Sequence, residues 1–513
     1  MKQYARLIEV KPEKSEGIIC VNCNGYGAPL NIGGLPFEHG IGTSGPAALT
    51  IAVPPGMERF EAWAGIDSEA REGSAVMRIL ADDVVVFDSG RISAQLWFHT
   101  INPNKPCKVC VPVTGGTRLT LLVETDHDTV LADWADAVFT GAGVPLYTKR
   151  SAVSDTLAPV PPMGVNTWNA FGPEINEAII HEYIDRMIED GYLQAGYSYL
   201  CLDDGWQDDS GFTWDTQKFP SGMKALGAYV HARGLQFGMY TRPMWVLGRE
   251  VEMAEKFAEW EIDFLKYDFS DHDAREANRR MAAALQATGR TVVFNACEWG
   301  KNRPWEWARE IGAHSWRVTY DVMDRWLVEK DCNSGIGILN AARQTEALGK
   351  YAGPGGWNDP DMLIVGLGGK GFVSGLCTPE QYRTQFSLWC LLSAPLFIGC
   401  DIRKATDETR EILLNTDAIA ICRDTLGVPG WRIKKRDTRE VWVKPLSNDE
   451  WAIGLLNCGD EACDISISLN ELYLTEPRSI YNVWTHEQEG NIDDVLERQV
   501  QPYETVLLRL GAR

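Results

Sequence analysis

The sequence predicts a multidomain protein in which two β domains flank a central (β/α)8 barrel. The middle of the chain alternates strand-like apolar runs with amphipathic helical segments, whereas both ends consist of short β-rich segments. A chain of 513 residues is also too long for a single hydrophobic core. We therefore expect a β-sandwich at 1–145, the barrel at 155–425 and an antiparallel β-sandwich at 430–513.

The N-terminal region has the pattern of a β-sandwich. Short runs rich in β-forming residues, separated by turn signals, occur at 49–53, 75–79, 84–87 and 119–123. Short strands at this spacing are typical of packed antiparallel sheets. The C-terminal region shows a similar pattern, with runs at 441–443, 451–455 and 505–508.

The central region has the alternation of a parallel barrel. One helix is marked by apolar residues at helical spacing, namely Ile179, Ile180, Tyr183, Ile184, Met187 and Ile188. Eight candidate strands begin near Gly164, Tyr199, Phe237, Phe264, Val293, Ser315, Gly356 and Pro395. Eight strand–helix units in about 260 residues match the size of a (β/α)8 barrel.

The composition excludes several classes of partner. A formal net charge of −22 argues against nucleic acid and anionic membranes, which need a basic surface, but is compatible with a neutral sugar. No apolar run is long enough to span a membrane, and no signal-peptide pattern follows Met1. Thirteen cysteines, an odd number, do not form a disulfide scaffold in a chain of this length. We therefore expect a cytoplasmic protein, and the oligomeric state stays open.

Polar and aromatic residues follow most of the candidate barrel strands. They are Trp168, Asp203, Asp204, Tyr240, Lys266, Asp268, Glu298, Arg317, Asp321, Asp359 and Asp361. The carboxyl ends of barrel strands meet at one face and build the active site. One Asp-Asp pair alone would more often be a strand cap or a salt bridge, but recurrence at seven strand ends favours a site. Carboxylates bind sugar hydroxyls, and glycoside hydrolysis needs two carboxyl groups. No metal, phosphate or nucleophile-elbow motif is present, so we expect neither metal nor cofactor.

The motifs at these strand ends carry a family resemblance. Residues 161–432 closely resemble glycoside hydrolase family 27, the α-galactosidase family, through segments at 162–168, 202–206, 265–268, 297–299, 315–317, 356–363 and 392–396. The resemblance implies a retaining, exo-acting hydrolase that removes terminal α-linked galactose from an oligosaccharide or glycoconjugate.

The resemblance also assigns roles to individual residues. It makes Asp268 the nucleophile and Asp321 the acid/base. It makes the galactose-binding residues Trp168, Asp203, Asp204, Tyr240, Lys266, Glu298 and Arg317. Lys266 and Asp268 are two residues apart on one strand, so their side chains share a face and the cation helps to keep the nucleophile ionised. Asp321, in contrast, must be protonated when the reaction starts.

The N-terminal region resembles the NPCBM family of carbohydrate-binding modules. The segments that carry this resemblance lie at 60–67, 86–90 and 133–137. It implies a jelly-roll sandwich. Sugar binding and a purely structural docking role both stay open for this domain.

Several positions depart from the α-galactosidase pattern. Secreted relatives carry two disulfides here. Pro173 and Gly205 stand at the positions of one disulfide, and Ser270 replaces one partner of the other, which leaves Cys297 unpaired. These losses fit a reducing compartment. Residues 241–245 also differ from the small, acidic residues of relatives, and Lys301 lies near the part of the site that contacts the sugar's 2-position.

Three alternatives remain at the level of the sequence. β-L-arabinopyranosidase and α-N-acetylgalactosaminidase use the same barrel; the Asp203–Asp204 pair disfavours the first, and Glu298, which would crowd an N-acetyl group, disfavours the second. A non-catalytic carbohydrate-binding protein would lack a catalytic carboxylate, whereas both are present. Two CxxC pairs, at 20–23 and 107–110, allow a zinc site, but buried free cysteines are the favoured interpretation.

Overall fold

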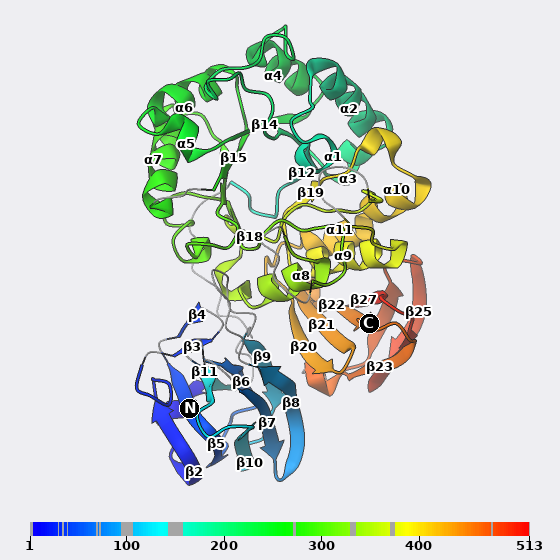
Figure 1. The fold of residues 1–513 in the computed structure, drawn as a ribbon. Helices are drawn as coiled ribbons and strands as arrows, with labels where there is room; N and C mark the ends of the chain where they lie inside the picture. The colour runs from blue at the N-terminus through cyan, green and yellow to red at the C-terminus, as the bar shows by residue number, and fades with distance from the viewer. Residues whose placement is uncertain are drawn as a thin grey trace.

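The computed structural model describes residues 4–511 except 29, 33–34, 38, 68–69, 71–72, 94–105, 142–156, 270–272, 329–334, 370–374, 473 and 475. Figure 1 shows an N-terminal β domain in blue, a barrel from green to yellow and a C-terminal β domain in orange and red. This arrangement confirms the predicted fold class. The expected boundaries at 145 and 155 lie outside the described residues.

The N-terminal domain is antiparallel. Its strands join in the order β8-β7-β10-β5-β11-β6-β9, with β1 on β11 and β2 on β5. Alternate residues such as Leu119, Leu121 and Val123 point into one apolar core, which explains the alternation seen in the sequence. The strands are β1 (Tyr4–Arg6), β2 (Pro12–Val21), β5 (Gly40–Ala52), β6 (Arg59–Ile66), β7 (Ser74–Ala81), β8 (Val84–Ser93), β9 (Cys107–Pro112), β10 (Arg118–Thr125) and β11 (Leu131–Thr140).

The barrel contains eight parallel strands, at the eight predicted places. They follow the chain order from β12 to β18, and β19 lies beside β12. The two end strands of this order are β18 and β19. A parallel bridge connects Leu363, which follows β18, to Ile398 on β19. The strands are β12 (Met163–Asn166), β13 (Tyr199–Leu202), β14 (Gln236–Thr241), β15 (Phe264–Asp268), β16 (Val293–Cys297), β17 (Ser315–Arg317), β18 (Trp357–Asp359) and β19 (Leu396–Ile398).

Helices surround these strands in Figure 1. The predicted helix is α2, in which Ile180, Tyr183, Ile184 and Met187 are buried, and the side chain of Asn176 caps its first turn. The helices are α1 (Trp168–Phe171), α2 (Glu177–Glu189), α3 (Tyr192–Ala195), α4 (Met223–Ala232), α5 (Pro243–Val246), α6 (Glu250–Glu259), α7 (Ala274–Ala287), α8 (Ile338–Glu346), α9 (Pro379–Leu391), α10 (Asp407–Leu413) and α11 (Thr416–Cys422).

The C-terminal domain is also antiparallel, as predicted. A six-stranded sheet has the order β20-β21-β22-β27-β24-β25, and β23 pairs with β26. Its strands are β20 (Trp431–Arg436), β21 (Arg439–Leu446), β22 (Glu450–Asn457), β23 (Cys463–Ser468), β24 (Arg478–Asn482), β25 (Glu487–Ile492), β26 (Val495–Val500) and β27 (Thr505–Gly511).

The C-terminal domain is fixed to the barrel by a buried lysine. The ammonium of Lys444 on β21 donates to Ser393 Oγ at 2.6 Å and to the carbonyl of Ile421. Burial lowers the pKa of Lys444 to about 8, so these acceptors have to compensate for its desolvation. The N-terminal domain contacts the C-terminal domain where β8 and β9 meet β20.

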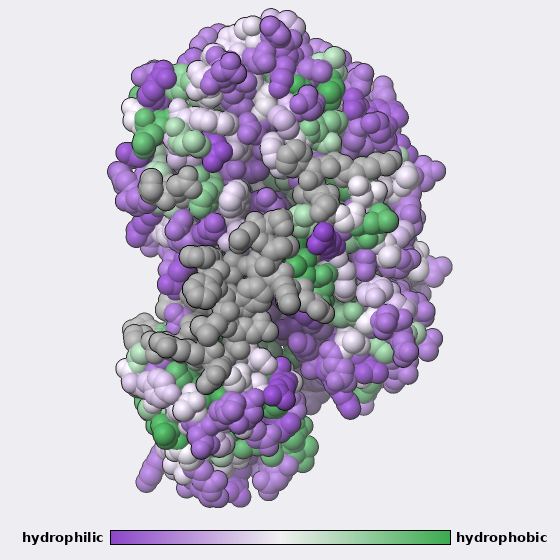
Figure 2. Space-filling view, viewed as in Figure 1, coloured by the Kyte–Doolittle hydropathy of each residue, from purple (hydrophilic) through white to green (hydrophobic). Residues whose placement is uncertain are grey.

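The surface and the cysteines complete the picture. Hydrophilic residues cover most of the face seen in Figure 2, in keeping with the high net charge. Across the described ranges, no helix is both long and apolar enough to cross a membrane.

The twelve described cysteines are all unbonded. The two CxxC pairs lie in different places: Cys20 is on β2 with Cys23 just after it, and Cys107 and Cys110 are on β9.

Candidate active site

The carboxyl end of β15 presents Asp268 beside Tyr240 of β14. The Tyr240 hydroxyl donates to Oδ2 of Asp268 at 3.0 Å. Burial, together with the charge of Asp268, raises the pKa of Tyr240, so the phenol stays protonated and orients the carboxylate. The other carboxylate oxygen, Oδ1, is buried and accepts no hydrogen bond from any residue that the structure describes. Asp268 is therefore held through one oxygen and has the other available to react.

Lys266 lies one layer below Asp268 on the same strand. Its ammonium contacts Oδ2 of Asp203 at 2.8 Å, and Asn166 Nδ2 donates to the same oxygen at 2.7 Å. Burial alone would lower the pKa of Lys266, but Asp203, Cys297 and Asp268 raise it well above its usual value. Lys266 is therefore a fixed cation between the two carboxylates.

Asp204 and Trp168 lie beside this group. Oδ1 of Asp204 accepts the N–H of Gly205 at 2.7 Å, and burial raises the pKa of this half-buried carboxyl. Trp168 follows β12, and its N–H donates to Asn166 Oδ1 at 2.9 Å. Two strand ends thus supply two carboxyl groups and an aromatic ring, one of the carboxylates paired with Lys266, a combination that suits a sugar ring with several hydroxyls.

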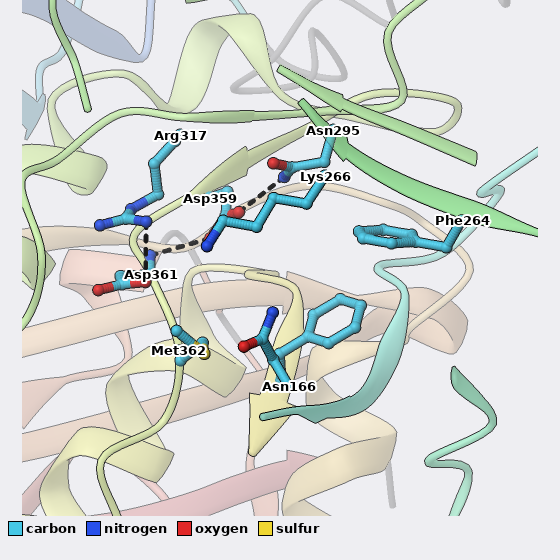
Figure 3. A pocket seen from close by; sticks show the side chains of 9 residues that line it. Asn166, Phe264, Lys266, Asn295, Arg317, Asp359, Asp361 and Met362 are labelled. Carbon is cyan, nitrogen blue, oxygen red and sulfur yellow. Dashed lines mark hydrogen bonds and ion pairs between the residues drawn. The ribbon is translucent and has the colours of Figure 1, made fainter. Parts of the chain in front are cut away.

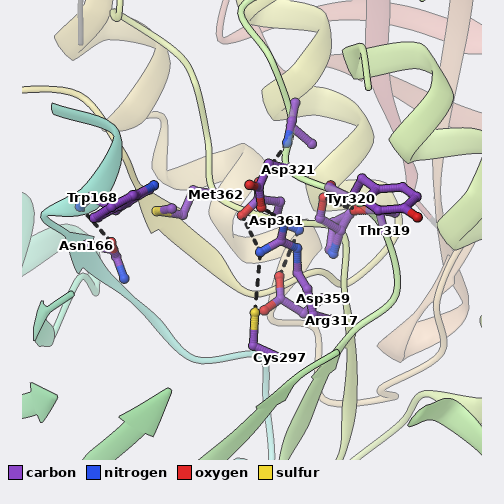
Figure 4. A network of polar contacts seen from close by, with 12 residues as sticks. Asn166, Trp168, Cys297, Arg317, Thr319, Tyr320, Asp321, Asp359, Asp361 and Met362 are labelled. Carbon is purple, nitrogen blue, oxygen red and sulfur yellow. Dashed lines mark hydrogen bonds and ion pairs between the residues drawn. The ribbon is translucent and has the colours of Figure 1, made fainter. Parts of the chain in front are cut away.

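Arg317 of β17 bridges two further carboxylates (Figure 4). Its Nη2 contacts Oδ1 of Asp321 at 2.7 Å, and its Nη1 contacts Oδ1 of Asp361 at 2.9 Å. The side chains of Arg317 and Asp361 are each 3% exposed, whereas that of Asp321 is 49% exposed. Asp321 is therefore the member of this group that meets solvent and an arriving substrate.

Asp361 holds both Arg317 and the chain segment that carries Asp321. Its Oδ2 accepts the N–H of Val322, directly after Asp321, at 2.7 Å. Burial raises the pKa of Asp361, and the charge of Arg317 opposes this rise and favours the carboxylate. Burial lowers the pKa of Arg317, but the carboxylates and Cys297 around it raise that pKa well above its usual value. Arg317 consequently stays positively charged, and Asp361 and Asp321 both pair with its guanidinium.

A pocket lies below these groups, inside the barrel (Figure 3). Asn295 on β16 donates to Asp359 Oδ2 at 2.8 Å and so links two walls of this pocket. Among the residues that the structure describes, no three His, Cys, Asp or Glu side chains converge in a way that could hold a metal. The pocket is lined by Asn166, Phe264, Lys266, Asn295, Arg317, Asp359, Asp361, Met362 and Phe397.

Of the nine predicted site residues, Glu298 lies outside this cluster. It is fully buried, and its two carboxylate oxygens accept hydrogen bonds from Asn278 at 2.8 Å and Asn302 at 3.2 Å. Strand β16 ends at Cys297, and Nη1 of Arg317 donates a hydrogen bond to the sulfur of Cys297 at 3.7 Å. The strand therefore turns Cys297 inward and the next side chain away. The role of Glu298 in binding the sugar stays a prediction.

Three residues of this site were given no role in the sequence-based prediction, and Asp361 was predicted only as one of the strand-end carboxylates. Asn166, Asn295 and Cys297 contact the predicted residues from neighbouring strands, and Asp361 holds Arg317. A usable signal existed for Asn295 and Cys297, because both alternate with outward residues on β16 and so share its inner face. No local signal pairs Asp361 with Arg317.

Comparison with known families identifies the barrel. The α-galactosidase A family model matches residues 161–424, which is more than half of the chain. The chain belongs to the α-galactosidase family, glycoside hydrolase family 27. The NPCBM/NEW2 domain model matches residues 7–140, and the α-galactosidase C-terminal β-sandwich model matches residues 436–510. The predicted family and the α-galactosidase activity expected from it are confirmed.

Individual relatives agree with this family assignment. An α-galactosidase of Cyamopsis tetragonoloba is 37% identical over 69% of this chain and 87% of its own. α-Galactosidase A of Cellvibrio japonicus is 38% identical over 70% and 94%. A Bacteroides fragilis structure assigned as an α-galactosidase/melibiase is 30% identical, with TM-score 0.65, over 97% of this chain and 98% of its own, so it spans all three domains. The α-galactosidase of Saccharomyces cerevisiae, solved with raffinose, is 27% identical over 69% and 98%, with TM-score 0.63.

Proposed function

We propose that this α-galactosidase acts by double displacement, with Asp268 as nucleophile and Asp321 as acid/base. Asp268 attacks C1 of the galactosyl unit while Asp321 donates a proton to the departing oxygen. Asp321 then takes a proton from the water that hydrolyses the galactosyl ester. The overall result is retention of the α configuration.

The contrast between the two aspartates carries this proposal. Asp268 receives a hydrogen bond at Oδ2 from Tyr240 and leaves Oδ1 without a partner among the described residues, as a nucleophile requires. Asp321 is half-exposed and held at one oxygen by Arg317, as a group that exchanges protons with substrate and water requires. Two carboxyl groups in such different environments support different tasks.

Arg317 and Asp361 have a supporting role in this mechanism. A cation next to Asp321 favours its ionised form, which would make it a poor proton donor. Asp361 contacts the same guanidinium and neutralises much of that charge. Asp361 is thus a positioning residue that lets Arg317 orient Asp321 without holding it deprotonated.

Asp203, Asp204 and Lys266 support galactose as the bound unit. Lys266 and Asn166 fix one oxygen of Asp203, so this carboxylate presents a defined acceptor to the ring hydroxyls. We propose α-galactosyl oligosaccharides as substrates, since the yeast relative was solved with raffinose. Glycoconjugates with a terminal α-galactose present the same unit.

We also propose a reducing compartment for this enzyme, in line with the expected cytoplasmic location. Pro173 and Gly205, at the positions of one family disulfide, are in direct contact, because a Cβ on Gly205 would lie 2.6 Å from Pro173 Cα. Close packing therefore occupies the place of the covalent link. Titration of the denatured protein without reductant should reveal all thirteen thiols. Fewer than twelve would mean that a disulfide forms.

The stereochemistry of the product tests the proposed function. Proton NMR should show α-galactose as the first product of hydrolysis, before mutarotation produces the β anomer. β-Galactose as the first product would exclude the double displacement and with it the role of Asp268.

A further inference from the structure

Lys301 lies in a cage of three aromatic rings. Its ammonium is 4.7 Å from the ring centre of Phe269, 5.4 Å from that of Tyr320 and 5.6 Å from that of Trp299. The rings of Phe269 and Trp299 are stacked, with 4.7 Å between their centres and an interplanar angle of 3°. Contacts of this kind hold a cation in place through the electron-rich faces of the rings.

Two rings of the cage are chain neighbours of the catalytic aspartates. Phe269 directly follows Asp268, and Tyr320 directly precedes Asp321. Lys301 itself follows β16 by four residues, at the carboxyl end of the barrel where the active site opens. The group that leaves the galactosyl unit departs next to the acid/base, and the chain segment that carries this residue also supplies one ring of the cage.

Lys301 differs from Lys266 and Arg317, the cations described above. Lys266 is paired with Asp203, and Arg317 with Asp321 and Asp361. The aromatic cage accounts for the contacts of the Lys301 ammonium with described residues, and no carboxylate of the described chain forms an ion pair with it. Three N–H donors are thus held in place with no anionic acceptor in the part of the chain that the structure describes, in a protein of net charge −22.

We propose that Lys301 forms a subsite for an anionic group, such as a carboxylate or sulfate, on the unit that leaves the galactose. An oxyanion there would accept charge-assisted hydrogen bonds from the ammonium, while the rings hold the lysine in position. The cage also keeps water away from part of the ammonium, which strengthens the attraction. This inference rests on the proposed function, because it concerns the second half of the same substrate.

Two matched substrates test it. 3-Carboxyphenyl and 3-carbamoylphenyl α-galactosides have the same shape, but only the first carries a charge, and a 3-sulfophenyl α-galactoside separates sulfate-like from carboxylate recognition. The wild-type enzyme should cleave the carboxylate about tenfold more efficiently in kcat/KM than the carboxamide, corresponding to one charge-assisted contact. Raising the ionic strength from about 0.05 M to about 0.5 M should reduce this preference.

Variants of the cage lysine complete the test. Lys301→Gln should abolish the preference for the anion, and Lys301→Arg should keep most of it. Lys256→Gln is the matched control, because Lys256 on α6 also lies over aromatic rings, Phe212 at 5.0 Å and Trp260 at 5.9 Å, on an outer helix. It should leave the preference unchanged.

Each other outcome overturns the inference. An equal loss on both substrates in Lys301→Gln would mean that the lysine only supports the rings, and a preference that survives in this variant would place the anion elsewhere. A wild type that cleaves both substrates equally would show that no such subsite exists. Failure of the proposed function looks different, because proton NMR would then show β-galactose as the first product from both α-galactosides.

Discussion

Replacing Asp361 with asparagine should move the basic limb of the pH–rate profile to lower pH. The asparagine has the same shape but no charge. Among the described residues, Asp321 is then the remaining ion-pair partner of the Arg317 guanidinium. A stronger net attraction to the ionised form of Asp321 makes the acid lose its proton at lower pH. The acid limb, which reports the nucleophile, should stay where it is.

The size of the effect follows from the geometry. Two unit charges about 4 Å apart interact by about 4 kcal/mol at an effective dielectric constant of about 20. The carboxylates of Asp361 and Asp321 lie on either side of one guanidinium and are farther apart, so about 1–2 kcal/mol is realistic, or about one pH unit. The loss of one partner of a buried cation should also lower the free energy of unfolding, by at most about 3–5 kcal/mol.

The assay compares two leaving groups over pH. With melibiose, whose leaving group needs a proton, kcat/KM above neutral pH should fall about tenfold in Asp361→Asn. With 4-nitrophenyl α-galactoside, whose leaving group departs without one, it should fall much less. Asp324→Asn is a matched control, because Asp324 is fully buried and accepts hydrogen bonds from Cys377 N and Tyr382 Oη instead of Arg317. An unmoved basic limb in Asp361→Asn, or the same shift in the control, would refute this reasoning.

Two further substitutions test the binding site and its frame. Lys266→Met removes the cation that lies 2.8 Å from the carboxylate of Asp203, which is 2% exposed. The value of kcat/KM should therefore fall at least 100-fold, an effect of about 3–5 kcal/mol. A loss of less than tenfold in steady-state kinetics would contradict the role of Lys266. Gly205→Ala places a Cβ 2.6 Å from Pro173 at φ +105°, so the free energy of unfolding should fall by about 1–3 kcal/mol in denaturant titrations. Gly248→Ala, at φ +77° with open space around it, should cost less, and equal losses would show that the contact with Pro173 is unimportant.

Much of this site was predictable because successive side chains of a strand point to opposite faces. Lys266 and Asp268 are two residues apart, so one strand was bound to present both to the same side, and it does. The eight strands were equally visible, since each is a short apolar run and seven of them are followed by polar or aromatic residues. The ends of parallel strands then converge by geometry alone.

Other features depend on contacts that a local pattern does not contain. The sequence shows Cys297 and Glu298 side by side, but only the course of the chain after β16 decides which of them faces the interior. The pairing of Arg317 with Asp361 joins two strand ends through the loop after β18. The cage around Lys301 likewise draws one ring from each of three loops, and no spacing in the sequence indicates it.

Rescue by azide tests the assignment of the two aspartates most directly. In Asp321→Ala the galactosyl ester still forms from 4-nitrophenyl α-galactoside, and azide, which needs no general base, attacks it from the opposite face to give α-galactosyl azide. In Asp268→Ala azide takes the place of the missing carboxylate and attacks the substrate itself, giving β-galactosyl azide. The mechanism predicts these opposite anomers. The same anomer from both variants, or full activity of Asp321→Ala on melibiose, would contradict it and direct the search for the acid/base to Asp359 and Asp361.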